Sequence, residues 1–231
     1  MTAPWTLDEL AHAGPEHLDP AFVAAYDRKQ GPDPVDDLAV LRRHGLDESA
    51  TLVDLGAGTG RLTLAAAPHC GRVIAVDVSP AMLEVLQRHV AGARLTNVEC
   101  VEAGFLTYEH EGPPADVVYT RNALHHLPDF WKAVALDRVA KMLRPGGILR
   151  LRDLVFDFQP SDADAAIGTW LDEAVTDPAE GYTCQELASH VRSEYSTFSW
   201  LLDPMLIAAG FEIVESEFDR STYGRYTCIK R

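Results

Sequence analysis

The segment TLVDLGAGTGRLTL, residues 51–64, limits most strongly how this chain can fold. An apolar run with strand character passes into a turn with glycine at positions 56, 58 and 60, and a helical pattern follows directly. Glycine in such a turn permits positive φ angles and lets a ligand approach the backbone closely. The segment therefore predicts a strand, a ligand-binding turn and a helix, in that order.

Strand and helix patterns alternate beyond this turn. Strand patterns at 51–55, 72–77, 97–102, 115–120 and 148–153 are interspersed with helical patterns at 59–67, 79–92 and 129–143. Such alternation predicts βαβ units, and hence an α/β fold with a doubly wound parallel sheet. Two further strand patterns, 211–218 and 224–231, are separated by a short gap and predict an antiparallel hairpin.

One segment interrupts the alternation. Residues 156–199 carry no strand pattern, and two amphipathic helical stretches, 162–175 and 183–195, occupy most of them. We therefore expect a helical insertion at 156–199 and short N-terminal helices within 1–48, all in a single domain, 1–231. The insertion is crowded with aromatic side chains, which form either a lid over a substrate or the small core of the insertion itself: Trp170, Tyr182, Tyr195, Phe198 and Trp200.

Two acidic residues end neighbouring strands. In open parallel sheets, ligands bind at the carboxyl ends of the strands, where Asp54 and Asp77 stand. Asp54 suits a ligand with an ammonium and a sulfonium better than a pyrophosphate, and Asp77 can accept hydrogen bonds from ribose hydroxyls. The purely structural alternatives are that the three glycines only form a tight turn and that Asp77 only caps the next helix. A dinucleotide-binding GxGxxG motif would need glycine where Arg61 stands, which disfavours an NAD-dependent oxidoreductase.

Together with these residues, the segments VIAVDVSPAML, PADVVYTRNALHHLPD and MLRPGGILRL closely resemble the class I S-adenosylmethionine-dependent methyltransferases. The resemblance runs from Tyr26 to the last strand. It implies a Rossmann-like, seven-stranded sheet, mostly parallel with an antiparallel last strand. It also implies S-adenosylmethionine as the cofactor and transfer of its methyl group to an acceptor.

The resemblance assigns cofactor contacts residue by residue. The methionine moiety faces Asp54 and the backbone of the turn, and Asp77 holds the ribose. The family often has an acid after the third strand that binds the adenine amino group, but here backbone groups and an aromatic ring are expected to replace it. The expected cofactor-binding residues are Tyr26 in a flap, Asp54, Gly56, Ala57, Gly58, Asp77, Val78 and Met82 beside the adenine, Gly104, Phe105 and Arg121.

Three arginines stand on or beside inner strands, where an unpaired charge is unfavourable. Arg121, Arg150 and Arg152 are expected to pair with carboxylates of this acidic chain. The alternative is that Arg121 or Arg152 holds an anionic group of a bound molecule.

Catalytic residues are expected in the loop after the fourth strand, which faces the transferred methyl group in the family. His125 or His126 is the candidate base, because an ordinary histidine pKa of about 6.5 suits proton transfer near neutrality. The alternative is that both cap the next turn or pack beneath the following helix. Tyr195 of the insertion is expected to contribute to turnover. Some quinone-pathway O-methyltransferases place metal-ligating acids where this chain has Asn122, His125 and His126, but we expect no metal.

The composition of the chain limits the classes of partner that it can bind. With 20 basic and 35 acidic residues, the formal net charge of −15 opposes nucleic-acid binding, and the (N/D)PP(Y/W) run of nucleic-acid amino-methyltransferases is missing. Widely spaced cysteines, with neither a signal-peptide pattern nor a membrane-spanning run, predict a cytoplasmic protein that does not bind membranes. We expect a monomer or homodimer. We expect a small-molecule acceptor. The alternative is a non-catalytic, cofactor-binding accessory protein of the same fold.

Overall fold

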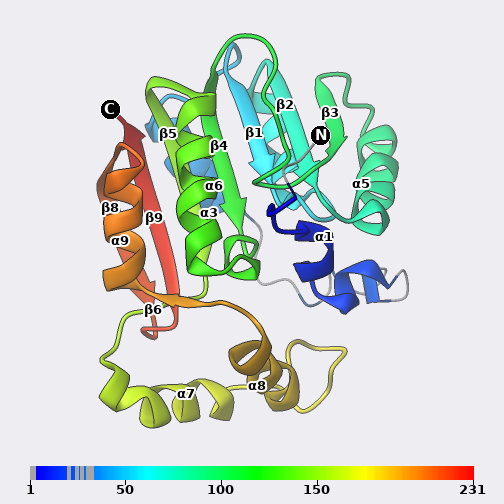
Figure 1. Cartoon of the computed structure of the whole chain (residues 1–231). Coiled ribbons are helices and arrows are strands. Elements are labelled where there is room, and N and C mark those ends of the chain that lie inside the picture. The colour runs from blue at the N-terminus through cyan, green and yellow to red at the C-terminus, as the bar shows by residue number, and fades with distance from the viewer. Residues whose placement is uncertain (1–3, 20–21, 24–25, 27–28, 30–33) are drawn as a thin grey trace.

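The computed structural model describes residues 4–19, 22–23, 26, 29 and 34–231. A seven-stranded sheet crosses the molecule in the order β3-β2-β1-β4-β5-β9-β8 (Figure 1). Its strands are β1 (Thr51–Leu55), β2 (Arg72–Asp77), β3 (Val98–Glu102), β4 (Ala115–Arg121), β5 (Leu143–Asp153), β8 (Phe211–Asp219) and β9 (Tyr223–Lys230).

The pairing of the strands confirms the expected fold. β1 pairs in parallel with β2 and β4, β2 with β3, and β4 with β5. β9 runs antiparallel between β5 and β8, so the last strand is the reversed one and the predicted hairpin is present. The carboxyl ends of β1, β2 and β4 therefore meet at one edge of the sheet.

Helices cover both faces of the sheet. Successive strand residues point to opposite faces, so Val53 and Ile74 belong to one apolar core and Leu52 and Val73 to another. The first core is closed by α6 (Asp129–Met142) and α9 (Ser199–Ala208). The second face is covered by α3 (Val35–Arg43), α4 (Arg61–Ala66) and α5 (Pro80–Gly92).

Four further helical segments lie beyond the carboxyl ends of the strands (Figure 1). They are α1 (Glu9–His12), η1 (Pro15–Leu18), α7 (Ala163–Asp172) and α8 (Cys184–Ser193). The expectation that 156–199 lacks strands is wrong in one respect, since β6 (Val155–Phe156) pairs in parallel with β7 (Thr197–Phe198). These strands are too short to show an alternating pattern.

Among the described residues, no helix has both the length and the apolar character needed to cross a membrane.

The inner arginines of β5 pair as expected with a carboxylate of the chain. Asp37 of α3 is fully buried, and its oxygens accept hydrogen bonds from Nε of Arg150 at 3.1 Å and from the hydroxyl of Tyr119 at 3.0 Å. Arg152 forms a second ion pair with the same carboxylate. One acid thus compensates two cations and ties α3 to the sheet.

Replacing Asp37 by alanine is expected to lower the free energy of unfolding by about 3–5 kcal/mol, because two largely buried guanidinium groups lose their counter-charge. Urea denaturation measures the change. Asp36→Ala is the matched control, since Asp36 lies in the same first turn but is exposed. Similar losses in both variants would contradict the structural role of the Asp37 cluster.

Candidate cofactor and acceptor site

The glycine turn connects β1 to α4 and brings its backbone against two other elements. Gly56 has φ +71°, and a Cβ placed there would lie 2.4 Å from Cβ of Ala123 in the loop after β4. Gly60 has φ +91°, and its Cβ would lie 2.0 Å from Leu86 of α5. Both positions therefore require glycine for space and for backbone conformation.

The two strand-end acids flank this turn. Asp77 accepts hydrogen bonds from the backbone N–H groups of Gly58 and Ser79, each at 2.8 Å. Asp54 is buried and accepts a hydrogen bond from the hydroxyl of Thr63 at 2.6 Å. Burial raises the pKa of Asp77, and it raises that of Asp54 to about 7. A cationic ligand beside Asp54 would stabilise its ionised form.

A cavity opens above the turn, here called the glycine-turn cavity. The expected cofactor residues on its wall are Tyr26, Gly56, Gly58, Asp77, Val78, Met82, Gly104, Phe105 and Arg121. Asp54 and Ala57 line an adjoining pocket that shares Tyr26, Gly56, Gly58 and Arg121 with it. The fold thus brings together around one turn every residue that the sequence placed at the cofactor.

One further residue of this cavity was missed. Glu9 of α1 is buried, and its carboxylate accepts the backbone N–H of Leu106 at 3.0 Å. A Cβ at Gly104 would lie 2.4 Å from Oε1 and 2.6 Å from Oε2 of Glu9. Burial raises the pKa of Glu9. A carboxylate therefore stands beside position 104 although the residue there has no side chain, and no local pattern connects the two positions.

A second cavity of about 490 Å³ lies between the N-terminal segment, the loop after β4 and the insertion; it is here called the insertion cavity. Phe22, Trp170, Tyr182 and Tyr223 contribute aromatic wall, and His125, Glu186, His190 and Glu194 contribute polar groups. The two cavities share His17, Tyr26 and Asn122, so they adjoin. Phe198 and Trp200 stack on each other outside both cavities, with ring centroids 5.4 Å apart.

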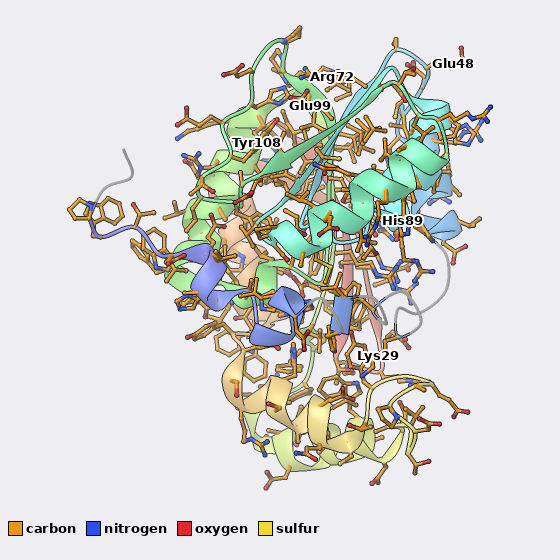
Figure 2. All side chains as sticks on the ribbon, turned by 90° about the vertical axis from the view of Figure 1, so that its right-hand side faces the viewer. Lys29, Glu48, Arg72, His89, Glu99 and Tyr108 are labelled. Atoms are coloured by element: carbon orange, nitrogen blue, oxygen red, sulfur yellow. The ribbon has the colours of Figure 1, made fainter. Side chains whose placement is uncertain are left out.

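An ion pair joins the N-terminal segment to the insertion at this cavity. Nζ of Lys29 lies 2.6 Å from Oε1 of Glu186 on α8 and 5.6 Å from the ring centroid of Tyr182. Figure 2 shows Lys29 between the N-terminal segment and the helices of the insertion. Glu186 also completes a capping box with Thr183 that begins α8.

The two adjacent histidines after β4 face different cavities. His125 lines the insertion cavity, and His126 lines the glycine-turn cavity beside His17, with ring centroids 5.5 Å apart. Burial and the neighbouring His125 ring lower the pKa of His126 well below its ordinary value. Among described residues, Nδ1 of His126 has no hydrogen-bond partner.

His125 is held between two carboxylates. Its Nδ1 contacts Asp153, its backbone N–H donates to Asp153 at 3.1 Å, and its Nε2 lies 3.0 Å from Oε2 of Glu194. Burial opposes a charge here, but Asp153 and Glu194 raise the pKa of His125 to about 9. The ordinary histidine pKa assumed from the sequence therefore applies to neither ring of the pair.

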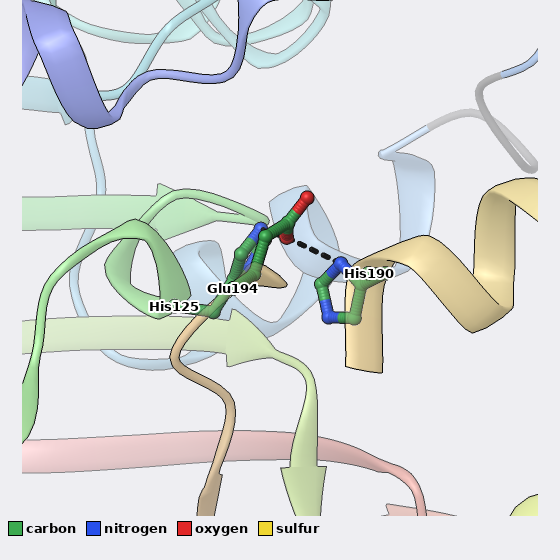
Figure 3. Close-up of side chains that lie close together, drawn as sticks. All are labelled: His125, His190 and Glu194. Atoms are coloured by element: carbon green, nitrogen blue, oxygen red, sulfur yellow. Dashed lines mark ion pairs between the residues drawn. The ribbon is translucent and has the colours of Figure 1, made fainter. Parts of the chain in front are cut away.

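Glu194 and His190 come from the insertion and were also missed by the sequence reasoning. Glu194 follows α8 in extended conformation and contacts Nδ1 of His190, as Figure 3 shows together with His125. One ligand atom from each of these three side chains lies within 4.8 Å of the others, so they could hold a metal ion. The spacing of His190 and Glu194 by four residues on a helix was the available signal.

The structure also places the other candidate residues that the sequence singled out. The ring of Tyr195 is 41% exposed and lies near His12, outside both cavities, because the chain turns Glu194 inward instead. Asn122, His125 and His126 do not converge as a metal-binding group: the Asn122 side chain contacts the hydroxyl of Tyr223, and the two histidines face different cavities.

Comparisons with known proteins identify the family. The Methyltransferase domain family matches residues 52–147. Carboxy-S-adenosyl-L-methionine synthase of Photorhabdus laumondii is 31% identical over 207 residues, which cover 84% of this chain and 78% of that protein. Trans-aconitate 2-methyltransferase of Methylobacterium radiotolerans is 36% identical over 146 residues, 61% of this chain and 53% of that protein, so this chain spans about half of that relative.

A solved structure shows the same fold. Phosphoethanolamine N-methyltransferase 2 of Haemonchus contortus, in complex with phosphomonomethylethanolamine and S-adenosylhomocysteine, matches with a TM-score of 0.72 at 17% identity, over 99% of this chain and 61% of that chain. The fold, the glycine turn with its two acids and these relatives define the class. The chain belongs to the class I S-adenosylmethionine-dependent methyltransferases, and its cofactor is S-adenosylmethionine.

Proposed function

We propose that this enzyme transfers the methyl group of S-adenosylmethionine to a small molecule bound in the insertion cavity. The observation that carries the proposal is this cavity of about 490 Å³, which adjoins the glycine-turn cavity through His17, Tyr26 and Asn122. Its volume lies within the range of small-molecule sites, about 300–1,000 Å³. A non-catalytic cofactor-binding protein would have no need of a second cavity beside the cofactor.

Within the glycine-turn cavity, we propose that Asp77 holds the ribose and that Val78 and Met82 flank the adenine. Glu9 takes the place of the acid that position 104 lacks, and its carboxylate accepts a hydrogen bond from the adenine amino group. This assignment is supported by the contact of Glu9 with the space beside Gly104 and by its position on the cavity wall. The N-terminal helix α1 thereby becomes part of the cofactor site.

For catalysis, we propose that His125 rather than His126 promotes ionisation of the acceptor. His125 lines the insertion cavity and is oriented by Asp153, whereas His126 faces the cofactor side. The proton of the acceptor passes to water; methyl transfer then breaks the carbon–sulfur bond, leaves its electron pair on sulfur and forms a bond from carbon to the acceptor atom. The chain's part is to position the acceptor in line with the methyl group.

Methyl transfer is tested by incubating the protein with deuterated-methyl cofactor and a whole-cell extract, then searching its small molecules, protein and nucleic acid for label by mass spectrometry. Ser189 lines the insertion cavity, so Ser189→Trp should fill it and abolish labelling while affinity for S-adenosylhomocysteine stays unchanged. Label found only in protein or nucleic acid would contradict a small-molecule acceptor. Tight cofactor binding without any labelled product would favour the accessory-protein alternative.

Synthesis of a carboxylated cofactor is a second candidate, because carboxy-S-adenosyl-L-methionine synthases are among the relatives. Arg121 on the glycine-turn cavity favours it, since Nε of Arg121 lacks a hydrogen-bond partner among the described residues and a carboxylate would supply one. Glu194 on the neighbouring wall opposes an anionic carboxyl donor and favours methyl transfer. The mass of the cofactor eluted from protein purified from cells separates the two candidates.

We further propose that the enzyme works in the cytoplasm, as a monomer or homodimer, without binding nucleic acid or membranes. Its four cysteines are free, and its formal charge of −15 opposes association with phosphodiester backbones. Sedimentation of the protein with and without added RNA measures both the oligomeric state and this binding.

A further inference from the structure

Three side chains on the wall of the insertion cavity converge from two parts of the fold, the loop after β4 and the end of α8. We propose that His125, His190 and Glu194 bind a divalent transition-metal ion of the Zn²⁺ class, and that a hydroxyl oxygen of the methyl acceptor completes its coordination. The role of the acceptor rests on the proposed function, whereas the ion site itself stands on the geometry of the three residues.

The donor atoms of the three side chains lie close together. Oε2 of Glu194 lies 3.0 Å from Nε2 of His125 and also contacts Nδ1 of His190. This buried oxygen forms ion pairs with both imidazole rings. Ligands at about 2.1 Å from a tetrahedral Zn²⁺ lie roughly 3.4 Å apart, and the three atoms here lie within 4.8 Å of one another. To hold the ion, Oε2 of Glu194 and Nδ1 of His190 must move apart, because they are in direct contact in its absence.

The outer nitrogen of each imidazole is held by another polar group. Nδ1 of His125 contacts the carboxylate of Asp153, and Nε2 of His190 lies 2.8 Å from the hydroxyl of Ser196. Such outer partners fix the tautomer and ring orientation of histidine ligands and increase their basicity. In this arrangement Nε2 of His125 and Nδ1 of His190 are the nitrogens available to the ion (Figure 3).

The charge and the opening of the site also suit a cation with a free coordination position. The buried carboxylate of Asp153 and the half-buried carboxylate of Glu194 stand here, and Lys29 is already paired with Glu186 of the cavity wall. Two imidazoles and one carboxylate leave at least one position of Zn²⁺ open, as in catalytic zinc sites. That position faces the insertion cavity, which all three ligands line.

An ion at this point would act on the acceptor as a Lewis acid. Coordination lowers the pKa of a hydroxyl group, so its proton passes to water and the oxygen stays bound as an alkoxide or phenolate. The oxygen then attacks the methyl carbon, the carbon–sulfur bond breaks with its electron pair on sulfur, and a methyl ether and S-adenosylhomocysteine result. The proposal thus narrows the acceptor to a hydroxyl-bearing small molecule.

The test is a titration of chelator-treated protein with Zn²⁺ by calorimetry and with Co²⁺ by visible absorption, in the presence of neither cofactor nor acceptor. One equivalent of each metal should bind, and bound Co²⁺ should show ligand-field bands. Asp153→Asn, which removes an outer partner, should weaken binding by roughly 10–100-fold. His190→Ala and the nearly isosteric Glu194→Gln remove direct ligands and should weaken it further. His69→Asn is the control, because His69, at the end of the short helix η2 (Ala67–His69), lies outside both cavities.

Two results would overturn the site: less than one equivalent of Zn²⁺ bound by the wild-type protein, or unchanged affinity in folded His190→Ala and Glu194→Gln, with circular dichroism verifying the fold. Either result leaves methyl transfer itself untouched, since no substrate is present in the titration. Stoichiometric metal binding by a protein that transfers no methyl group would instead contradict the proposed function while supporting the ion site.

Discussion

Gly104→Asp should weaken binding of S-adenosylhomocysteine in the otherwise unchanged chain, and the same substitution should strengthen binding when Glu9 is alanine. In the first case the new Cβ lies 2.4 Å from Oε1 of Glu9, so two carboxylates compete for one space and α1 is displaced. In the second case the space is vacant, and the introduced aspartate supplies the carboxylate from the loop after β3. Calorimetry on the four proteins of this cycle measures the reversal of sign.

The size and the specificity of the effect follow from the proposed hydrogen bond. Glu9→Ala should cost about 1–3 kcal/mol of cofactor affinity, since an adenine amino group loses its acceptor in a buried site. The inosine analogue of S-adenosylhomocysteine, which lacks that amino group, should be rejected by the wild type and tolerated by Glu9→Ala. If Glu9→Ala loses the same affinity for S-adenosylhomocysteine and for the inosine analogue, Glu9 only supports the loop through Leu106. Its assigned role in recognising the adenine is then wrong.

His125→Gln should lower the single-turnover rate of methyl transfer by about 10²–10⁴-fold, because the group that promotes ionisation of the acceptor is lost. Its affinity for S-adenosylhomocysteine should remain that of the wild type, since His125 lines only the insertion cavity. His126→Gln is the matched control on the same turn. It should change cofactor affinity and lower the rate less than tenfold (about 1.4 kcal/mol).

Asp153→Asn tests the positioning part of the same prediction. It removes the carboxylate that holds Nδ1 of His125 while leaving the imidazole in place, so the rate should fall and the cofactor affinity should not. Rates are measured with the acceptor found by isotope labelling and with the cofactor saturating. Equal, small losses in His125→Gln and His126→Gln would mean that the pair serves only to shape the loop after β4.

The amino-acid sequence by itself determined the sheet and the cofactor end of the site. The strand and helix patterns, the glycines of the turn, and Asp54 and Asp77 at the ends of β1 and β2 are local features. A turn that directly follows a strand lies at the edge of the sheet. Because neighbouring parallel strands end at the same edge, their last residues come together whatever the rest of the chain does. The antiparallel position of β9 follows in the same way from its short connection to β8.

Only the tertiary structure decided which residues complete the two cavities. Glu9 reaches Gly104 across 95 positions of the chain, and His190 and Glu194 reach His125 from a helix whose orientation no residue pattern encodes. The turn after α8 points Glu194 inward and leaves Tyr195 outside, although the sequence favoured the aromatic residue.

The folded surroundings also separated the pKa values of the two adjacent histidines. Burial lowers the pKa of His126, whereas at His125 the carboxylates of Asp153 and Glu194 outweigh burial and raise the pKa to about 9. The pKa of each histidine depends on the charged groups that surround its ring in the folded chain. Those groups come from distant segments, so they surround the ring only once the chain has folded.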